Sequence, residues 1–452
     1  MSQTRAEIAQ IPLGQQPISH RQFIVLALPL ILSTLSTPML GAVDTGVVGH
    51  FPDPAYIGGV AVGAMIFNTL YWLLGFLRVS TSGFSAQAHG ANHRTEVLMT
   101  LIRPMGLAMM FGVLFILLQS PIKQIAMWII HPGQGVEAHA ATYFDIRIWG
   151  APFALINYCI LGWLIGVSRV RMALFLQVFM NLLNIALDCL FVIILQMGVS
   201  GVAAASLISE ITAVMIGMVI LFRVGELKGS TWSWTKVFES EAFVKMIKVN
   251  RDLFIRTTCL LTVFGLFTAY GASMGEAALA ANAILLQIHF IMAYFLDGIA
   301  NASSILVGRS IGQKNKVLYS HTIKLSAIWS FIASMFLASI VIVAGDFIIS
   351  LFTSIEEIQR VTANYLFWVT IFPFVGFWGL QLNGVFSGAT EAGPIRNSLI
   401  ISLLLFLLAI WMFIPQWGNH GLWLSFIVFS LARSLVLWAY LPKLSRTTIP
   451  SS

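Results

Sequence analysis

The chain contains 452 residues, of which 58% are hydrophobic and only 10% charged, with a mean hydropathy of +0.87 and a formal net charge of +7. A soluble domain carries about 25% charged residues, so this composition excludes a fold whose surface is covered by water. The first twenty residues are polar and predict a tail without a cleavable signal peptide. Cys159, Cys189 and Cys259 fall in apolar runs without metal-ligand spacing, which indicates buried thiols.

Twelve apolar segments are long enough to span a bilayer, since crossing the hydrocarbon core takes about 20 residues. In chain order they lie near 22–47, 57–77, 97–119, 142–165, 172–196, 199–222, 252–273, 278–300, 319–343, 362–386, 396–415 and 419–441. We therefore predict an all-α polytopic membrane protein.

The placement of basic residues predicts the orientation of these helices. With the N-terminus in the cytoplasm, most of the 25 Lys and Arg residues, Arg78 among them, fall on cytoplasmic ends and loops. Only Lys123, Arg147 and Arg360 fall on the far side. We expect both termini in the cytoplasm, and the basic charge needs no nucleic-acid partner to explain it.

An internal repeat divides the chain into two halves. Gly90 recurs as Gly312 and Gly166 as Gly388 at an offset of 222, and Gly198 recurs as Gly418 at an offset of 220. An even number of helices in each half makes the two units parallel repeats. We predict a cytoplasmic tail, a six-helix lobe, a cytoplasmic connector, a second six-helix lobe and a cytoplasmic tail, at 1–20, 21–223, 224–250, 251–442 and 443–452.

A polar stripe runs along the fifth predicted helix. Gln177, Asn181, Asn184 and Asp188 are spaced by four, three and four residues, which places them on one helical face. Because an ionisable group at membrane depth costs several kcal/mol, we interpret the stripe as functional rather than only as a contact between helices. Asn184, one turn from Asp188, is expected to bond to its carboxylate.

The first predicted helix combines an acid with two prolines. Asp44 lies near its end, and Pro29 and Pro38 each remove a backbone hydrogen bond and can bend the helix. The alternative is that Asp44 lies at the water interface.

Other charged groups fall at membrane depth. Glu210 and Arg433 lie midway along the sixth and twelfth helices, and each is expected to contribute to a buried polar contact. We include Glu210 and Asn157 among the candidate site residues. Asp297, near the cytoplasmic end of the eighth helix, is expected to snorkel or to pair with a nearby base, and Asp252 to pair with Arg256 four residues later.

No catalytic or metal-binding motif is present, so we expect neither an enzyme nor a cofactor. Gly271 to Gly275 match a nucleophile elbow in sequence, but they lie between two spanning helices rather than after a strand. There is no P-loop or metal-ligand pair on a helix, so any uphill work has to be driven by an ion gradient or by a partner.

Several motifs in order resemble the multidrug and toxic compound extrusion (MATE) family over essentially the whole chain. They are Val43-Asp44-Thr45, Val48-Gly49-His50, Gly166-Val167-Ser168-Arg169, Asn184-Ile185-Ala186-Leu187-Asp188 and Gly198-Val199-Ser200-Gly201. Stretches such as Leu77-Arg78-Val79-Ser80-Thr81 and Tyr294-Phe295-Leu296-Asp297-Gly298 are similar to its DinF-type branch. The resemblance implies a MATE-like fold of two six-helix lobes.

The resemblance also implies site residues. The family's proton-handling residues carry over onto Asp44, Asp188, Asn184 and Tyr143, and its hydroxyl on helix six onto Ser206. The NorM-type branch instead carries acids on helices seven and ten, where this sequence has no membrane-embedded carboxylate. That departure favours protons over sodium.

The predicted function is secondary active efflux of amphipathic or cationic organic compounds by proton antiport, as in antibiotic resistance. Protonation of Asp44 and Asp188 would displace substrate while the two lobes alternate access. We expect a monomer in the bacterial inner membrane whose partners are small organic substrates and membrane lipids. Sodium-coupled export and flipping of a lipid-linked oligosaccharide are the alternatives.

Overall fold

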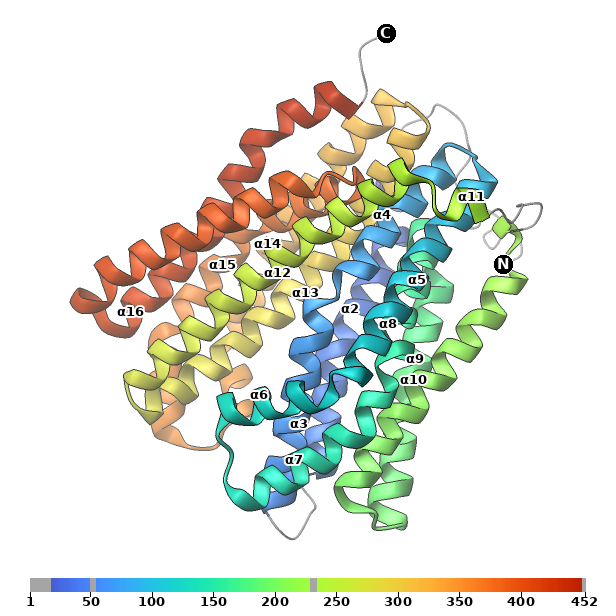
Figure 1. Ribbon diagram of the computed structural model, residues 1–452. Helices are drawn as coiled ribbons and strands as arrows, with labels where there is room; N and C mark the ends of the chain where they lie inside the picture. The colour runs from blue at the N-terminus through green and yellow to red at the C-terminus, as the bar shows by residue number, and fades with distance from the viewer. Residues whose placement is uncertain (1–17, 49–53, 228–233, 449–452) are drawn as a thin grey trace.

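The computed structural model describes residues 18–48, 54–227 and 234–448, with side chains apart from those of 37–48, 54, 134 and 447–448. The side chains of Asp44 and Pro38 therefore lie outside the described residues. Within the described part, the chain is helical throughout and contains no strand, which confirms the predicted all-α class (Figure 1).

In the whole described chain, ten helices are long and apolar enough to cross a membrane. This count reads α3 and α4, α7 and α8, α9 and η2, and α11 and α12 each as one span.

The first half contains α2 to α10 and three short helical turns. The elements are α2 (His20–Val48), α3 (Pro54–Leu73), α4 (Phe76–Gly90), α5 (Arg94–Leu117), α6 (Gln119–Ile130), α7 (Gln134–Arg147), η1 (Ile148–Gly150), α8 (Ala151–Gly166), α9 (Val170–Asp188), η2 (Cys189–Ile194), α10 (Gly198–Arg223) and η3 (Gly225–Leu227).

The second half contains longer helices. They are α11 (Trp234–Val237), α12 (Ser240–Ser273), α13 (Glu276–Gly312), α14 (Lys316–Phe352), α15 (Glu356–Gly388) and α16 (Ala392–Thr448). Gly418, at φ 52°, breaks α16 into two parts. Counting these two parts separately and adding α2 to the ten long helices gives the twelve predicted spans.

Several helix boundaries were predicted wrongly. The seventh span begins at Ser240 rather than at 252, and the eighth continues to Gly312 rather than ending at 300. The second span does not end at residue 77 but continues after a turn at Leu74 and Gly75 through α4 to Gly90. Arg78 therefore lies about 18 Å from Gly90 at the helical rise of 1.5 Å per residue. It is not at the end of the span, because small polar residues in α4 lower the hydropathy without ending the span.

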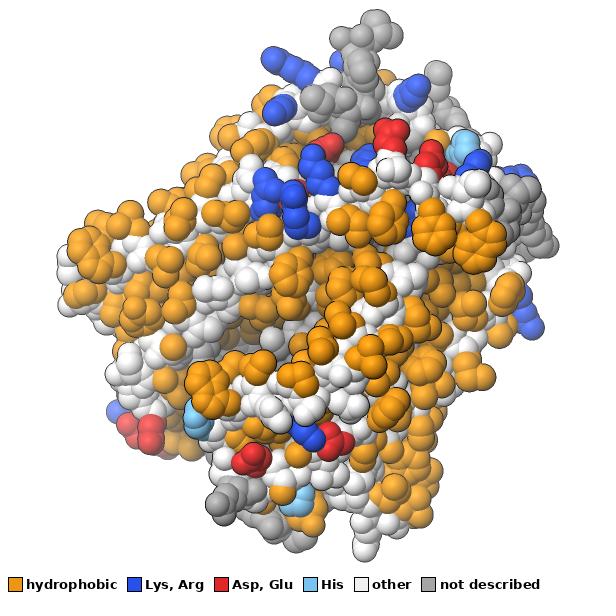
Figure 2. Space-filling model, viewed as in Figure 1, with side chains coloured by type: hydrophobic (Ala, Val, Ile, Leu, Met, Phe, Trp, Pro, Cys, Tyr) orange, Lys and Arg blue, Asp and Glu red, His pale blue; other side chains and the backbone are white. Residues whose placement is uncertain are grey.

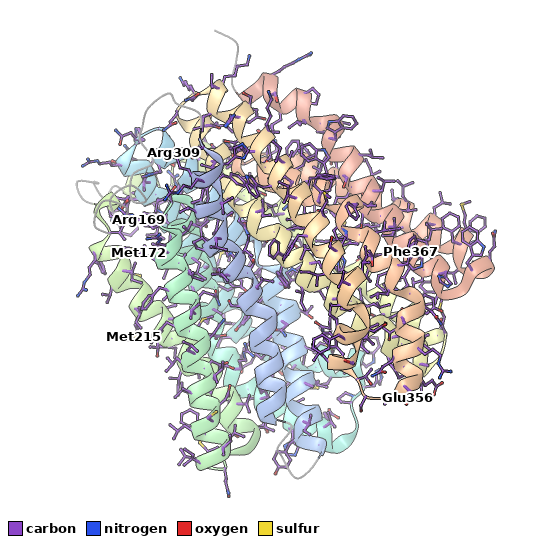
Figure 3. The ribbon with its side chains drawn as sticks, turned by 180° about the vertical axis from the view of Figure 1, so that it is seen from behind. Arg169, Met172, Met215, Arg309, Glu356 and Phe367 are labelled. Carbon is purple, nitrogen blue, oxygen red and sulfur yellow. The ribbon has the colours of Figure 1, made fainter. Side chains whose placement is uncertain are left out.

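Charge separates the two ends of the bundle. Arg169 and Arg309 lie together at one end, which we call the basic end, and Glu356 lies at the other (Figure 3). In the face shown in Figure 2, Lys and Arg side chains gather at the basic end while apolar side chains cover the middle. This is the distribution expected of a bundle whose middle faces lipid.

The repeat is visible in the backbone as well as in the sequence. Asn92 and Lys314 are related by the offset of 222 and have φ values of 55° and 53°. Ser168 and Thr390, related by the same offset, have φ values of 64° and 57°. The left-handed conformation is uncommon for residues other than glycine, so its recurrence confirms that the two halves share one local geometry.

Glycines let the two halves approach at the basic end. A Cβ on Gly90 would meet the backbone of Arg309, and a Cβ on Gly312 would meet the backbone of Gln87 and Ala91. Gln87 Nε2 also donates to the Gly388 carbonyl at 2.9 Å. The repeat glycines that the sequence singles out therefore form the contact between α4 and α13.

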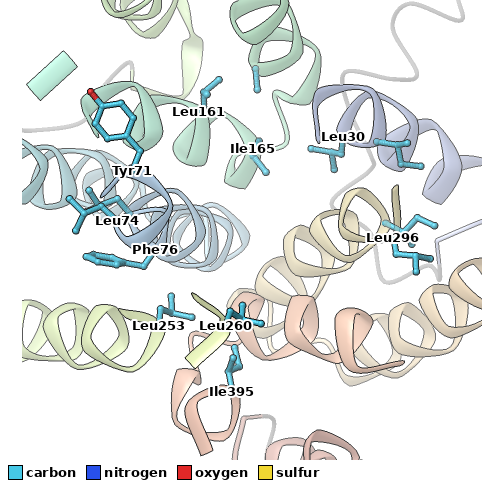
Figure 4. Packing of buried hydrophobic residues seen from close by; sticks show 14 of the residues in the cluster. Leu30, Tyr71, Leu74, Phe76, Leu161, Ile165, Leu253, Leu260, Leu296 and Ile395 are labelled. Carbon is cyan, nitrogen blue, oxygen red and sulfur yellow. The ribbon is translucent and has the colours of Figure 1, made fainter. Parts of the chain in front are cut away.

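Helix α2 also contacts the second half. Thr34 Oγ1 donates to the Tyr294 carbonyl of α13 at 2.8 Å, and Gly298 lies against the backbone of Ile31. Buried apolar side chains such as Leu30 and Leu296 fill the surrounding core (Figure 4).

Substituting Gly312 by Val tests the contact at the basic end. Its Cβ would lie 2.8 Å from the Ala91 nitrogen, and backbone atoms cannot move aside as a side chain does. We expect a loss of about 1–3 kcal/mol, the usual cost of overpacking, seen as a lower melting temperature in detergent. Gly106→Val is the control, because a Cβ on Gly106 meets nothing within 4 Å; equal melting temperatures for the two variants would contradict the proposed close contact.

Candidate functional site

Among the described side chains of the first half, Asp188 is the most deeply buried acid. It ends the 19-residue helix α9, about 27 Å from the basic-end residue Val170 at 1.5 Å per residue, and it is 1% exposed. A π-helical turn, η2, follows immediately. π-helical turns are rare, and those that occur are frequently found at functional sites. The backbone next to Asp188 therefore also indicates a functional position.

The predicted polar stripe lies on the buried face of α9. Gln177, Asn181 and Asn184 are all less than a tenth exposed. Gln177 Nε2 donates to Asn181 Oδ1 at 3.2 Å, and Asn184 Nδ2 lies 3.5 Å from Ser206 Oγ on α10. Asn184 thus contacts Ser206, whereas the sequence led us to expect a bond to the Asp188 carboxylate.

A second polar cluster lies beside the stripe and is built around an ion pair. Arg147 Nη2 is 3.4 Å from Glu210 Oε1, and Arg147 Nη1 donates to the hydroxyl of Tyr143 one turn earlier on α7. Glu210 is one helical turn from Ser206 on α10, so the two clusters are adjacent. Tyr143, which the resemblance groups with Asp44, Asp188 and Asn184, is bonded to Arg147 in this second cluster.

Aromatic rings enclose the Arg147 guanidinium. Its Cζ lies 5.2 Å from the ring centroid of Phe67, 5.9 Å from that of Tyr71 and 5.6 Å from that of Tyr143. Cations within about 6 Å of an aromatic face are stabilised by the ring quadrupole. The charge at this depth is thus held by one carboxylate, one hydroxyl and three rings.

Arg147 and Tyr71 were not predicted as site residues. Arg147 was assigned to the far side of the membrane, but its side chain is 15% exposed and lies inside the first half. A signal was available, because Arg147 follows Tyr143 by four residues within an apolar run and so shares its helical face. The partner of Glu210 is therefore Arg147, on a neighbouring helix.

The other predicted positions are distributed around these clusters. Asn157, 3% exposed on α8, points its amide at Met180 Sδ at 3.4 Å. Pro29 lies inside α2, which continues as one helix past Pro38 and Asp44 to Val48. Helices α2 and α9 pack against each other, so the helices that carry the two predicted aspartates are neighbours.

The second half differs from two expectations. Asp252 does not pair with Arg256; it accepts from Arg251 and Arg396, each at 2.8 Å. Asp297 accepts from Asn301 Nδ2 at 3.2 Å, and within the described chain it has no base within 4 Å. Spacing along α12 did not reveal that Asp252 pairs with its neighbour Arg251 and with Arg396 of α16.

The first-half site combines a buried acid with amides and a hydroxyl. A carboxylate at Asp188 can accept and release a proton, and amides and a hydroxyl within one or two turns can rearrange around either state. Within the described chain, no group of three His, Cys, Asp or Glu side chains is placed to hold a metal ion. The described arrangement thus offers acid–base and hydrogen-bonding groups at membrane depth.

Known proteins match the chain over nearly its whole length. It is 38% identical over 414 residues to DNA damage-inducible protein F of Escherichia coli K12, which covers 92% of this chain and 90% of that protein. It is 24% identical over 442 residues to a probable multidrug resistance protein NorM of Thermotoga maritima, covering 94% and 92%.

Solved structures share the fold. A MATE crystal structure in the straight conformation superposes with a TM-score of 0.88 at 18% identity, covering 98% of this chain and 100% of that one. A MOP superfamily transporter from Pyrococcus furiosus superposes with a TM-score of 0.86 at 18% identity, covering 98% and 99%. The MatE family model matches twice, over residues 29–190 and 254–414, once in each half. The chain is thus a multi-pass membrane transporter that belongs to the MatE family.

Proposed function

We propose that this transporter exports amphipathic organic compounds, cationic dyes among them, in exchange for protons. The observation that carries the proposal is the burial of Asp188 in a polar face that continues through Asn184 and Ser206. Protonation of a buried carboxylate removes a charge and turns an acceptor into a donor. Bound substrate and bound proton then favour different arrangements of the same side chains.

Helix α2 connects this site to the second half. It packs against α9 on one side, and it bonds to α13 through Thr34 on the other. In the proposed cycle, protonation at Asp188 and Asp44 changes the packing of α2 at Pro29 or Pro38, and the halves change their relative position. One charge moving through 100 mV supplies about 2.3 kcal/mol, enough for roughly fiftyfold accumulation.

The basic end is cytoplasmic in this proposal, in accord with the positive-inside rule, and the membrane is the bacterial inner membrane. The close contact of Gly90 and Gly312 with the opposite half at that end supports a state closed toward the cytoplasm. Protons are favoured over sodium because α12 beyond Asp252 and α15 beyond Glu357 carry no carboxylate, and Arg256 and Arg433 add positive charge in the second half.

The first prediction concerns coupling. In proteoliposomes with an imposed pH gradient, the wild type should move ethidium, and Asp188→Asn should lose coupled movement at least tenfold because it cannot release a proton. Asp44→Asn should behave similarly. Asp145→Asn is the matched control, since Asp145 on α7 is half exposed and pairs with Lys123.

The same assay separates the competing functions. Dye movement that follows a sodium gradient and ignores pH would replace proton coupling by sodium coupling. Absence of any dye movement by folded protein would favour flipping of a lipid-linked oligosaccharide. If dye moves and both aspartate variants stay fully coupled, the site assignment is wrong.

The second prediction concerns Glu210, whose charge is balanced by Arg147. Arg147→Met leaves a carboxylate and Glu210→Gln leaves a guanidinium without its partner, so each should destabilise the protein by about 3–5 kcal/mol. The double variant Arg147→Met/Glu210→Gln should lose less than the sum of the two. Melting temperatures in detergent measure this non-additivity, and strictly additive losses would contradict the ion pair.

Proton coupling by Glu210→Gln, assayed on the fraction that remains folded, should stay intact. This result would identify the Arg147–Glu210 pair as a structural element beside the site. Loss of coupling in this variant with normal stability would instead make Glu210 a proton carrier.

A further inference from the structure

The second half contains two arginines that no described carboxylate neutralises by direct contact. Arg433 on α16 is 8% exposed, and its Nε and Nη2 atoms have no hydrogen-bond partner among the described residues. Arg256 on α12 likewise has a buried Nε without a partner in the described chain. A guanidinium removed from water costs several kcal/mol unless it is paired, so two such groups together need an explanation.

These arginines lie at the same level of two packed helices. Helix α12 packs against α16, and the rings of Phe264 and Phe426, each about two turns from its arginine, lie 5.8 Å apart between centroids. Asp297 lies at the same level of α13, because it is two turns from His289, whose ring contacts both phenylalanines. One carboxylate therefore accompanies two guanidinium groups, which leaves a net positive charge.

An aromatic layer lies beside this charged layer. Phe264 is eight residues beyond Arg256 on α12, His289 eight before Asp297 on α13, and Phe426 seven before Arg433 on α16. Seven or eight residues are two helical turns, so each ring shares a helical face with a charged group about 10–12 Å away. Because α13 and the last part of α16 run antiparallel to α12, all three rings lie on the same side of the charges.

The rings are in contact with each other. The His289 ring lies 4.9 Å from that of Phe426 and 6.1 Å from that of Phe264, measured between centroids. Phe264 lies 6.0 Å from Trp72 of α3, which is 39% exposed. The aromatic layer therefore reaches the boundary between the two halves, where an exposed indole offers an apolar surface.

From this geometry we propose that Arg433 and Arg256 form a binding site for an oxyanion attached to an apolar body. The carboxylate, phosphate or sulfonate accepts hydrogen bonds from the unpartnered guanidinium nitrogens, which prefer such groups in a forked geometry. The apolar body lies against Phe264 and Trp72. The site is separate from the Asp188 cluster, and it extends the proposed substrates to anionic and zwitterionic amphipaths.

Such an oxyanion has two sources, a free amphipathic compound or the phosphate of a membrane lipid. Both present the same chemistry to the arginines. That the bound compound is then exported rests on the proposed function, whereas binding itself needs neither a gradient nor transport. A binding experiment therefore stands even if the proposed proton coupling fails.

The test uses two probes with one apolar body and opposite charge, pyrenebutyrate and pyrenebutyltrimethylammonium. Full-length protein is placed in nanodiscs of phosphatidylcholine, and binding is followed by energy transfer from tryptophan to pyrene. Wild type should bind pyrenebutyrate saturably. Arg433→Gln should weaken that binding at least tenfold, as expected for loss of a charge-assisted hydrogen bond, and should leave binding of the cationic probe unchanged.

Matched variants keep the result interpretable. Arg433→Lys retains the charge but not the fork and should restore part of the affinity, while Arg256→Gln should weaken it independently. Arg446→Gln removes an exposed arginine of the same helix and should change nothing. Equal affinity of wild type, Arg433→Gln and Arg256→Gln for pyrenebutyrate, with all three folded by gel filtration, would overturn the proposal.

A second set of nanodiscs containing phosphatidylglycerol identifies the source of the anion. If phosphatidylglycerol weakens the binding of pyrenebutyrate to the wild type and soluble anions at equal charge density do not, a lipid phosphate is supported as the occupant. Undiminished binding of pyrenebutyrate supports a free amphipathic anion. An equal loss of affinity for both probes in Arg433→Gln would count against an anion site, since it would show a general disturbance of packing.

Discussion

Lipid offers no hydrogen bond to a buried side chain, so each polar group inside this bundle depends on partners supplied by neighbouring helices. In the first half, Arg147 has a carboxylate, a hydroxyl and three aromatic rings around it. In the second half, Asp252 has two arginines. Arg433 differs from both, because no described carboxylate pairs with it and its Nε and Nη2 have no hydrogen-bond partner among the described residues.

Most of the fold could be predicted from composition and periodicity. Long apolar runs predict spans because length and hydropathy are properties of each segment alone. The repeat was also accessible, since Gly90 and Gly312 must be glycines for the same reason, a close backbone contact that admits no Cβ. The boundary at residue 77 failed because α4 buries Ser80, Thr81, Ser82 and Ser85, and buried serines lower hydropathy without requiring water.

The candidate site was predicted only in part, for a different physical reason. Helical spacing identified the face shared by Gln177, Asn181, Asn184 and Asp188, because that face is a property of one helix. The partners come from other helices. Asn184 of α9 contacts Ser206 of α10 rather than Asp188, and Glu210 of α10 pairs with Arg147 of α7. Which helix packs beside which depends on the whole bundle, and one sequence carries little information about it.

The two halves share their local backbone geometry but carry different charged groups: a buried acid, Asp188, in the first half and arginines in the second. Equivalent left-handed turns at Ser168 and Thr390 give both halves the same frame. On that frame, the first half places a carboxylate at Asp188, which can bind a proton, and the second places guanidinium groups, which cannot release theirs. Helix α2 contacts α9 and, through Thr34, α13. A change of charge at Asp188 can therefore be transmitted to the second half through α2, which packs against α9 and bonds to α13.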